Sequence, residues 1–297
     1  MRKQIVVIVS LAIAASLFTG CGNSGEPKKE NTGLAADGEV EDVYFGGLTM
    51  NGMTEDEFNS KLNAESATNY KIKYYDDLNT LLMALDRGDI ENIWTNEASA
   101  EYIIGHNEGK YDMKDPEIAE GIASYFGYSM ATKASNVEEA GGNVELSLTL
   151  NEAIKGLQED GTLDKLKAEY IDDSGSRELP EPEALPVIEG ADTYKVIITG
   201  DVPPMDYVTA DGEAAGYNIA LLSAISKKAN INFELVTSAT GSKVTALQSG
   251  KADILFWALG IKQGEDGEMS YDADLPDGIT VTTPYLEIRQ KVIIKAK

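Results

Sequence analysis

YKVIITGDVPPMDYVTADGEAAGYN, residues 194–218, is the stretch that decides the fold. Val196, Ile197 and Ile198 form a short continuous apolar run, which is typical of a strand buried on both faces of a sheet. A Pro-Pro loop follows this strand, and a glycine-containing turn follows the loop. A strand, a loop and a turn in this order indicate the beginning of an α/β domain, although they lie in the second half of the chain.

A second stretch, LSLTLNEAIKGLQEDGTLDKLKAEYI at residues 146–171, lies upstream and has the features of a domain's end. It consists of two helical segments that break at Asp160-Gly161. Both stretches resemble parts of the bacterial extracellular solute-binding proteins, family 3, the amino-acid-type receptors of ABC importers. In that family the strand opens the domain and the helices close it, whereas here their order is exchanged. The resemblance implies an α/β, two-lobed, periplasmic-binding-protein-like (type 2) fold with a hinge and a circularly permuted segment order.

Two phrases that share a pattern favour a fold with two related lobes. LLMALDRGDIENIWTN (81–96) and KVTALQSGKADILFWA (243–258) both contain Ala-Leu-x-x-Gly, an acid three residues later and an apolar segment with a tryptophan. The leucines before Gly88 follow the i, i+3, i+4, i+7 spacing of an apolar helix face. Gly88 and Gly250 stand where a helix end favours a left-handed residue. Each phrase therefore predicts a helix, a tight turn and a buried strand, which is half of a βαβ unit.

The composition and the resemblance together divide the chain into segments. Residues 172–192 combine acids, prolines and little apolar periodicity, which is typical of a linker. The expected segments are a lipoprotein signal peptide at 1–20, a lipidated cysteine and flexible tether at 21–42, lobe 2 at 43–126, a return strand and closing helices on lobe 1 at 127–171, the linker at 172–192, and the main segment of lobe 1 at 193–297.

A circular permutation joins the original ends of a domain and opens the chain elsewhere, here at one of two crossings between the lobes. We expect a permuted monomer; the alternative is two half-domains that exchange partners in a dimer. In the permuted monomer, a strand near 289–295 corresponds to one that leaves lobe 1 for lobe 2 in relatives. The chain end near Lys297 is then expected to lie against the start of lobe 2 near Val43.

The N-terminal residues have the features of a targeting segment, which is left out of fold reasoning. Arg2 and Lys3 precede an apolar run at 5–18 that is too short to span a bilayer as a mature helix. The sequence Phe-Thr-Gly-Cys ending at Cys21 resembles a lipobox, which implies cleavage before Cys21 and attachment of a lipid; the alternative is an ordinary signal peptide with an incidental cysteine. Cys21 is the single cysteine, so no disulfide can form within the chain. We expect an extracytoplasmic protein that a lipid holds at the cell membrane.

The formal net charge of the chain is −25. No basic face can be assembled to neutralise phosphates, which excludes nucleic-acid binding as a function. The charge suits a soluble, self-repelling protein that is held at a membrane by lipid rather than by basic patches. His106 is the single histidine and has no partner at metal-ligand spacing, so neither a metal nor a cofactor is expected.

The resemblance also implies where a ligand binds. In relatives, a small solute binds between the lobes, and the membrane permease recognises the closed form. Clefts between domains and the C-terminal ends of parallel strands favour ligand sites. The candidate ligand-binding residues are Asp201, Met205, Tyr217 and Trp257 in lobe 1 and Thr54, Asn96 and Glu97 in lobe 2. No catalytic residue is expected.

Thr54 begins a predicted helix and has two interpretations. It can form a capping box with Glu57 at the helix start. In relatives, backbone N–H groups at the corresponding place bind a ligand carboxylate. Acids at positions 55–57 crowd this helix end with negative charge, which favours capping. The phrase Gly-Gly-Leu-Thr at 46–49 is a second candidate for the same loop.

The two charged side chains that hold an amino acid in relatives do not occur at the matching positions. Counting from Asp253 to the family's arginine reaches Gly264 or Glu265, and counting from Glu91 to its aspartate reaches Asn96. A buried ligand carboxylate without its arginine partner would be costly. A standard α-amino acid bound in the family's usual way is therefore not expected.

The side chains that replace this pair are aromatic, acidic and amide-bearing, which leads to a hypothesis for the ligand. A polar, neutral or cationic solute would stack on Trp257 and form hydrogen bonds with Asn96 and Asp201. The alternative is that Trp257 packs in the core. The same choice between lining the cleft and packing applies to three tyrosines, Tyr207, Tyr217 and Tyr285.

The function expected from the residues and the resemblance is that of a substrate-binding protein of an ABC importer, which captures an amino acid or a related compound. Two alternatives stay open: a solute-sensing or degenerate receptor lipoprotein that acts with a separate partner, and a dehydratase-like enzyme on the same fold. The enzyme would need an acid or base in the cleft, and Asp201, Glu97 and Glu265 are candidates. The expected partners of the monomer are the solute, the permease and the membrane.

Overall fold

The computed structural model describes most of the chain after residue 41. The described residues are 42–48, 54–63, 69–116, 125–134, 144–237, 243–263, 269–271 and 275–297. They all belong to one compact unit, Leu34–Lys297. Cys21, the expected signal peptide at 1–20 and Glu265 lie outside the described residues. Within the ranges given above, no helix combines the length and the apolar character needed to cross a membrane.

Helices and strands alternate along much of the chain, as expected for an α/β fold. The strands are β1 (Asp42–Leu48), β2 (Asn69–Tyr75), β3 (Asn92–Asn96), β4 (Tyr111–Lys114), β5 (Tyr125–Lys133), β6 (Thr193–Ile198), β7 (Asp201–Val202), β8 (Asp206–Val208), β9 (Ala214–Ala215), β10 (Asn232–Thr237), β11 (Ile254–Gln263), β12 (Met269–Tyr271), β13 (Ile279–Val281) and β14 (Leu286–Lys295). The helices are α1 (Glu55–Asn63), α2 (Leu78–Arg87), α3 (Glu97–Gly105), α4 (Val144–Glu159), α5 (Thr162–Leu166), the π-helix η1 (Lys167–Ile171), α6 (Tyr217–Ala229) and α7 (Lys243–Gln248).

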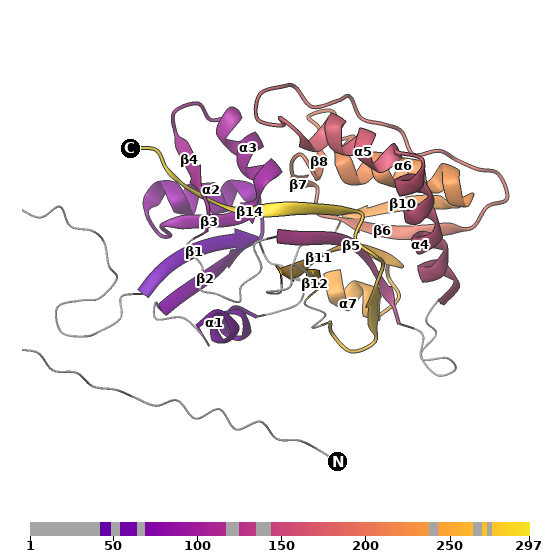
Figure 1. The fold of residues 1–297 in the computed structure, drawn as a ribbon, viewed down its shortest axis with the longest axis horizontal. Coiled ribbons are helices and arrows are strands. Elements are labelled where there is room, and N and C mark those ends of the chain that lie inside the picture. The colour runs from indigo at the N-terminus through magenta and orange to yellow at the C-terminus, as the bar shows by residue number, and fades with distance from the viewer. Residues whose placement is uncertain are drawn as a thin grey trace, which may run out of the picture. The chain divides into compact units, whose positions relative to one another are not determined.

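The main sheet has two halves that share one strand. Its order is β10-β6-β11-β5-β14-β3-β1-β2, with β12 beside β11, β13 beside β5 and β4 beside β14. Residues 286–289 of β14 pair with β5, and residues 290–295 pair with β3 and β4 (Figure 1). We call the part formed by β5–β13 and α4–α7 lobe 1, and the part formed by β1–β4 and α1–α3 lobe 2. β14 therefore joins the two lobes through its backbone hydrogen bonds as well as through the chain.

Lobe 2 is built on parallel strands with a helix between them, as the sequence predicts. β1 pairs in parallel with both β2 and β3. Leu81 and Leu85 of α2 are buried and pack with Ile93 of β3. The side chain of Asp77 caps the start of α2, and Gly88 ends the helix in the left-handed region. This core is separate from that of lobe 1.

The matching phrase in lobe 1 folds in the same way. α7 buries Leu247, and Gly250 follows in the left-handed region with a φ of +74°. β11 begins at Ile254 and pairs in parallel with β6, which also pairs in parallel with β10. The prediction of a helix, a tight turn and a buried strand in each lobe is confirmed.

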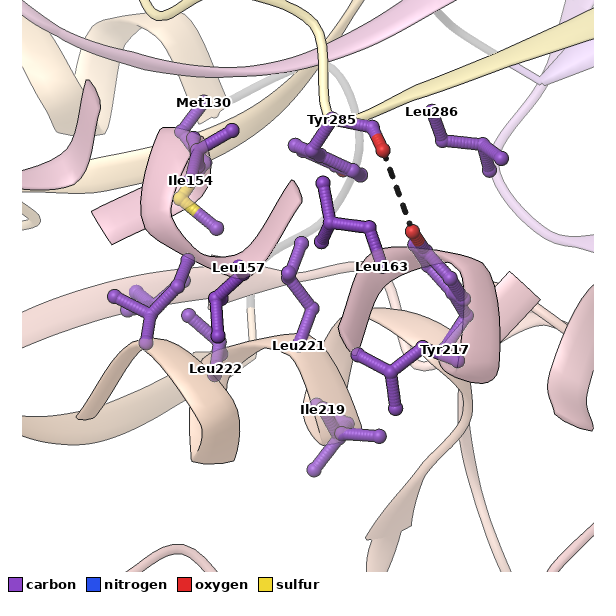
Figure 2. Packing of buried hydrophobic residues seen from close by; sticks show 14 of the residues in the cluster. Met130, Ile154, Leu157, Leu163, Tyr217, Ile219, Leu221, Leu222, Tyr285 and Leu286 are labelled. Atoms are coloured by element: carbon purple, nitrogen blue, oxygen red, sulfur yellow. Dashed lines mark hydrogen bonds between the residues drawn. The ribbon is translucent and has the colours of Figure 1, made fainter. Parts of the chain in front are cut away.

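α4 and α6 supply a large part of the core of lobe 1. Figure 2 shows Ile154 and Leu157 of α4 gathered with Leu221 and Leu222 of α6 in one buried cluster. Full burial of one such side chain contributes about 1.5–3 kcal/mol. The helices that resemble a domain's end therefore pack on the segment that resembles its beginning, although the chain order is exchanged.

The path of the chain end differs from the expectation. Residues 290–295 pair with β3 and β4, so only the first part of the segment 193–297 belongs to lobe 1. β3 lies between β14 and β1, so the chain end does not lie against Val43 in β1. Instead, the N–H of Ala296 donates to the carbonyl of Lys110 after β14 has formed its ladder with β4. The ladder satisfies backbone groups that would otherwise need another partner.

The expected linker at 172–192 is fully described and forms no helix or strand along its length. Hydrogen bonds nevertheless attach this segment to both lobes. Ser174 Oγ donates to the carbonyl of Ala98 in α3 at 2.9 Å. Glu183 accepts a hydrogen bond from Ser223 Oγ of α6 at 2.7 Å. The segment therefore contacts α3 of lobe 2 as well as α6 of lobe 1.

Candidate functional site

A cavity of about 150 Å³ lies between the two lobes. Lobe 2 contributes residues of β1, α2, β3 and α3, and lobe 1 contributes β5, the loop after β6, α6, α7 and β11. Most of the lining side chains are apolar, for example Leu48, Leu81, Ile103, Phe126, Leu255 and Phe256. The few polar side chains therefore determine which ligand the cavity can select.

The loop after β6 forms one wall of the cavity, as the rule for parallel strands predicts. Met205 in this loop is buried and lines the cavity. The neighbouring carboxylate of Asp206 accepts hydrogen bonds from the N–H groups of Thr199 and Gly200 at 2.7 and 2.9 Å. Its other oxygen accepts a hydrogen bond from Asn218 Nδ2 at 2.9 Å. These bonds satisfy the buried carboxylate and fix the loop.

Asn96 lies in the opposite wall, where β3 ends and α3 begins. Its Oδ1 accepts a hydrogen bond from the N–H of Ser99 at 2.9 Å, so Asn96 is the N-cap of α3. Its Nδ2 donates to Ser99 Oγ at 3.1 Å and to the hydroxyl of Tyr128 in β5 at 3.0 Å. Asn96 therefore holds α3 of lobe 2 against a strand of lobe 1.

Lys243 places a cation in the wall that α7 contributes. Its Nζ donates a hydrogen bond to Thr199 Oγ1. Burial lowers the pKa of the Lys243 ammonium, while the carboxylates of Asp206 and Asp201 oppose this effect. Among the residues that the structure describes, no carboxylate lies within 4.0 Å of this ammonium. Lys243 is thus a largely buried charge without an ion-pair partner in the described part of the chain.

Asp201 connects the lobes beside the cavity without lining it. Its Oδ2 accepts a hydrogen bond from the N–H of Leu78, the first residue of α2, at 3.0 Å. Its Oδ1 is buried and has no hydrogen-bond partner in the described ranges. Burial raises the pKa of the Asp201 carboxyl, although the Leu78 N–H favours the charged form. Asp201 therefore acts as a cap for a helix of the other lobe.

Three of the seven predicted ligand-binding residues line the cavity: Met205, Asn96 and Trp257. The other four, which do not line it, are Asp201, Glu97, Thr54 and Tyr217. Asp201 lies beside the cavity, as described above. Glu97, the first residue of α3, forms an ion pair with Lys291 of β14 at 3.3 Å. This ion pair joins α3 to the strand that the two lobes share.

Thr54 and Tyr217 lie outside the lining, and each has a structural role. The N–H of Thr54 donates to Glu57 Oε2 at 2.8 Å, and the N–H of Glu57 donates to Thr54 Oγ1 at 3.2 Å, so the predicted capping box is confirmed. Tyr217 is fully buried and stacks with Tyr285 at 6.0 Å between ring centres. Figure 2 shows the Tyr217 hydroxyl bonded to the carbonyl of Tyr285, so both tyrosines pack in the core.

Trp257 has both of the roles that the sequence left open, packing in the core and lining the cavity. It is only 3% exposed and packs with Ile197 and Leu247 in a core cluster, yet it also lines the cavity. Asn96 and Asp201, which the hypothesis assigns to ligand binding, each cap a helix in this structure. The core fixes the ring of Trp257, so its contact with a ligand would be a rigid one.

The polar groups of the lining that were not among the predicted site residues include those of Lys243, Tyr128 and Trp94. Lys243 stands four residues before Leu247, so it lies on the buried face of α7, and this spacing could have revealed it. It adds a basic side chain to the lining at a position other than those of the family's charged pair. Tyr128 and Trp94 lie within apolar strands, where an aromatic residue gives no signal that separates lining from packing.

Two α/β lobes, a strand that belongs to both, and a cavity between them define a two-lobed α/β binding-protein architecture. Within the described residues, no group of His, Cys, Asp or Glu side chains is arranged to hold a metal ion. Residues 194–297 match the family model described as bacterial extracellular solute-binding proteins, family 3. This segment, which lies in the second half of the chain, is where the chain is similar to that family.

The relatives are distant. The "Probable histidine-binding protein" of Neisseria gonorrhoeae is 26% identical over 111 residues, which cover 37% of this chain and 38% of that protein. The chain thus spans less than two fifths of the length of this curated relative. Two solved structures with similar folds are the tungstate ABC transporter from Geobacter sulfurreducens and the probable amino-acid ABC transporter extracellular-binding protein from Bacillus subtilis.

The similarity to the Geobacter structure has a TM-score of 0.41 at 10% identity and covers 86% of this chain and 85% of that chain. The similarity to the Bacillus structure has a TM-score of 0.34 at 10% identity, with coverage of 86% and 85%. The architecture therefore rests on the sheet order and the separate cores described above rather than on these low scores.

Proposed function

We propose that this chain is an extracytoplasmic substrate-binding protein of an ABC importer, which captures a small solute between its lobes. The observation that carries the proposal is the cavity of about 150 Å³ with walls from both lobes. A ligand that contacts both lobes stabilises the arrangement in which they approach each other. The family match over residues 194–297 supports a receptor function.

The names of the relatives support an importer of amino acids or related compounds. One is called a probable histidine-binding protein, and another a probable amino-acid ABC transporter extracellular-binding protein. The proposal includes a lipid at Cys21, a permuted monomer and a permease partner. The family's description as extracellular supports a location outside the cytoplasm.

The arrangement of acids around the cavity does not favour the enzyme alternative. Acid–base catalysis needs an acid or base within reach of the substrate. In the described part of the chain, Asp206 accepts hydrogen bonds that fix its own loop, and Asp201 caps α2. Glu97 is paired with Lys291. Each of these acids already has a structural role.

Native mass spectrometry of the full chain, purified without refolding, tests the proposal first. A retained small molecule would support the receptor function and give the ligand mass. Thermal unfolding with a panel of amino acids, amines, amides and carboxylates tests it independently, because a ligand that binds only the folded state raises the melting temperature.

Cavity filling provides the matched control. Ala258 lines the cavity, so Ala258→Leu should abolish the ligand-dependent rise in melting temperature. Ala168 is exposed in η1, so Ala168→Leu should leave the rise unchanged. A chain that retains no molecule and responds to no compound in the panel would contradict the receptor function. So would a response that Ala258→Leu and Ala168→Leu preserve equally.

A further inference from the structure

The carboxylate and amide oxygens in the cavity lining are already used by the protein. Asp206 accepts hydrogen bonds from two backbone N–H groups and from Asn218. Asn96 Oδ1 accepts from the N–H of Ser99 at 2.9 Å. Asn218 Oδ1 accepts from the Tyr285 hydroxyl at 3.1 Å. A ligand that donates hydrogen bonds would therefore compete with bonds that hold the cavity walls together.

Three polar groups of the lining, those of Lys243, Tyr128 and Trp94, offer uncommitted donors. The Lys243 ammonium carries three N–H bonds, and the hydrogen bond found for it within the described residues goes to Thr199 Oγ1. The Tyr128 hydroxyl accepts from Asn96 and keeps its own O–H for another partner. The Trp94 Nε1–H is buried and has no acceptor in the described ranges. This excess of donors selects a ligand that accepts hydrogen bonds.

The charge of the lining also favours a ligand that accepts hydrogen bonds. Lys243 is largely desolvated, and among the described residues no carboxylate lies within ion-pair distance of it. A buried ammonium is costly unless it is paired. Asp206 is close enough to favour the charged lysine, but its oxygens bond to Asn218 and to the loop after β6. An anionic ligand would supply the missing charge-assisted hydrogen bond.

The rest of the lining is apolar and sets the size of the ligand. Phe126, Phe256 and Trp257 contribute aromatic surfaces, and Leu255 and Met205 contribute aliphatic ones. An apolar cavity of about 150 Å³ can hold a benzene-sized molecule. The ligand therefore has a compact apolar body and a small anionic end.

We propose that the cavity binds a small aliphatic or aromatic monocarboxylate, whose carboxylate accepts hydrogen bonds from Lys243 and whose apolar body contacts Phe126, Phe256 and Trp257. This inference rests on the proposed receptor function and names its substrate class. It replaces the hypothesis of a neutral or cationic solute, because the described lining offers free donors and occupied acceptors. An α-ammonium group on the ligand would find those acceptors already bonded.

Isothermal titration calorimetry on the full chain tests the inference with three matched probes. 4-Methylpentanoate is the carboxylate, 4-methylpentanamide is its neutral form, and leucine is the same carboxylate with an α-ammonium group. A second set of benzoate and benzamide covers an aromatic body. We expect each carboxylate to bind about tenfold or more tightly than its amide, since a hydrogen bond to a charged group contributes that much.

Substitutions at position 243 test whether Lys243, rather than another part of the cavity wall, contributes the affinity for the carboxylate. Lys243→Met should weaken carboxylate binding about 10- to 100-fold and weaken amide binding by a smaller factor, because the hydrogen bond to a neutral amide oxygen contributes less than the bond to a carboxylate. Lys243→Arg should retain most of the carboxylate affinity. Lys251→Met is the control, because Lys251 is exposed in the turn after α7. The comparison of carboxylate with amide on the unmodified chain does not depend on whether any variant folds.

Several results would overturn the inference while leaving the receptor function intact. One is tighter binding of leucine or of an amide than of the matched carboxylate. Another is an equal effect of Lys243→Met and Lys251→Met on carboxylate affinity. A third is binding of other panel compounds but of neither carboxylate. If no compound of any class binds and no molecule is retained on purification, the receptor function itself fails.

Discussion

Replacing Asp201 tests whether a hydrogen bond between the lobes stabilises the fold. Asp201 Oδ2 accepts from the N–H of Leu78 at 3.0 Å, at the start of α2, where backbone N–H groups lack partners within the helix. Asp201→Asn keeps an oxygen acceptor at this place, whereas Asp201→Ala removes it. Loss of such a cap costs about 1 kcal/mol. We therefore expect the alanine variant to have a free energy of unfolding about 1 kcal/mol below that of the asparagine variant.

The free energy of unfolding should depend differently on pH in the unmodified chain and in Asp201→Asn. Burial raises the pKa of the Asp201 carboxyl in the folded chain above the ordinary value of 3.8. The folded state then binds this proton more tightly than the unfolded state, so the contribution to stability is fully present below pH 3.8. It is lost as the pH rises through the folded-state pKa. The unmodified chain should therefore lose stability relative to Asp201→Asn as the pH rises above 3.8 and through the folded-state pKa.

Urea denaturation followed by tryptophan fluorescence at several pH values measures this difference. Asp160→Asn is a comparison of opposite sign, because hydrogen bonds from Lys228 and Thr162 lower the pKa of Asp160 to about 2. Its contribution is present above pH 3.8 and is lost as the pH falls towards 2. A difference between the unmodified chain and Asp201→Asn that is constant with pH, or that has the sign of the Asp160 comparison, would refute the reasoning.

Two further substitutions test the packing. In Gly105→Ala, a Cβ would meet the carbonyl oxygen of Gly175 at 1.8 Å, so α3 and the segment after η1 must move apart. We expect the free energy of unfolding, measured by urea denaturation, to fall by about 1–3 kcal/mol. An unchanged midpoint would contradict this close contact. Leu150 in α4 is 0% exposed and Leu148 is 59% exposed, so Leu150→Ala should cost about 2–5 kcal/mol while Leu148→Ala stays within about 0.5 kcal/mol; equal thermal shifts would show that α4 does not pack on α6 as described.

Much of the fold could be predicted because its signals are local. The apolar run at 196–198 forms the centre of β6, and the leucine spacing before Gly88 forms α2. The shared phrase in each lobe fixes a helix, a turn and a strand without knowledge of the partner strand. The division of β14 between the lobes is not a local property. It depends on pairing with β3 and β5, which lie far away in the sequence.

The candidate site was predicted less completely, because its residues act through contacts between the lobes. Asp201 was expected to hold a ligand, but the approach of α2 turns it into a helix cap. Asn96 lines the cavity, and its amide group is used by Ser99 and Tyr128. Lys243 was not predicted, because the rule that places ligands at the ends of parallel strands does not select a residue at the start of a helix. Burial and hydrogen-bond partners, which decide these roles, follow from tertiary structure alone.

Hydrogen–deuterium exchange of the full chain with and without a bound solute tests the central claim most directly. One ligand is expected to contact both lobes in the cavity. A solute identified by thermal unfolding should slow exchange in residues 96–103 of lobe 2 and in residues 199–206 and 255–258 of lobe 1 at the same time. Saturable binding with protection confined to one lobe, or with protection outside these segments, would contradict the account.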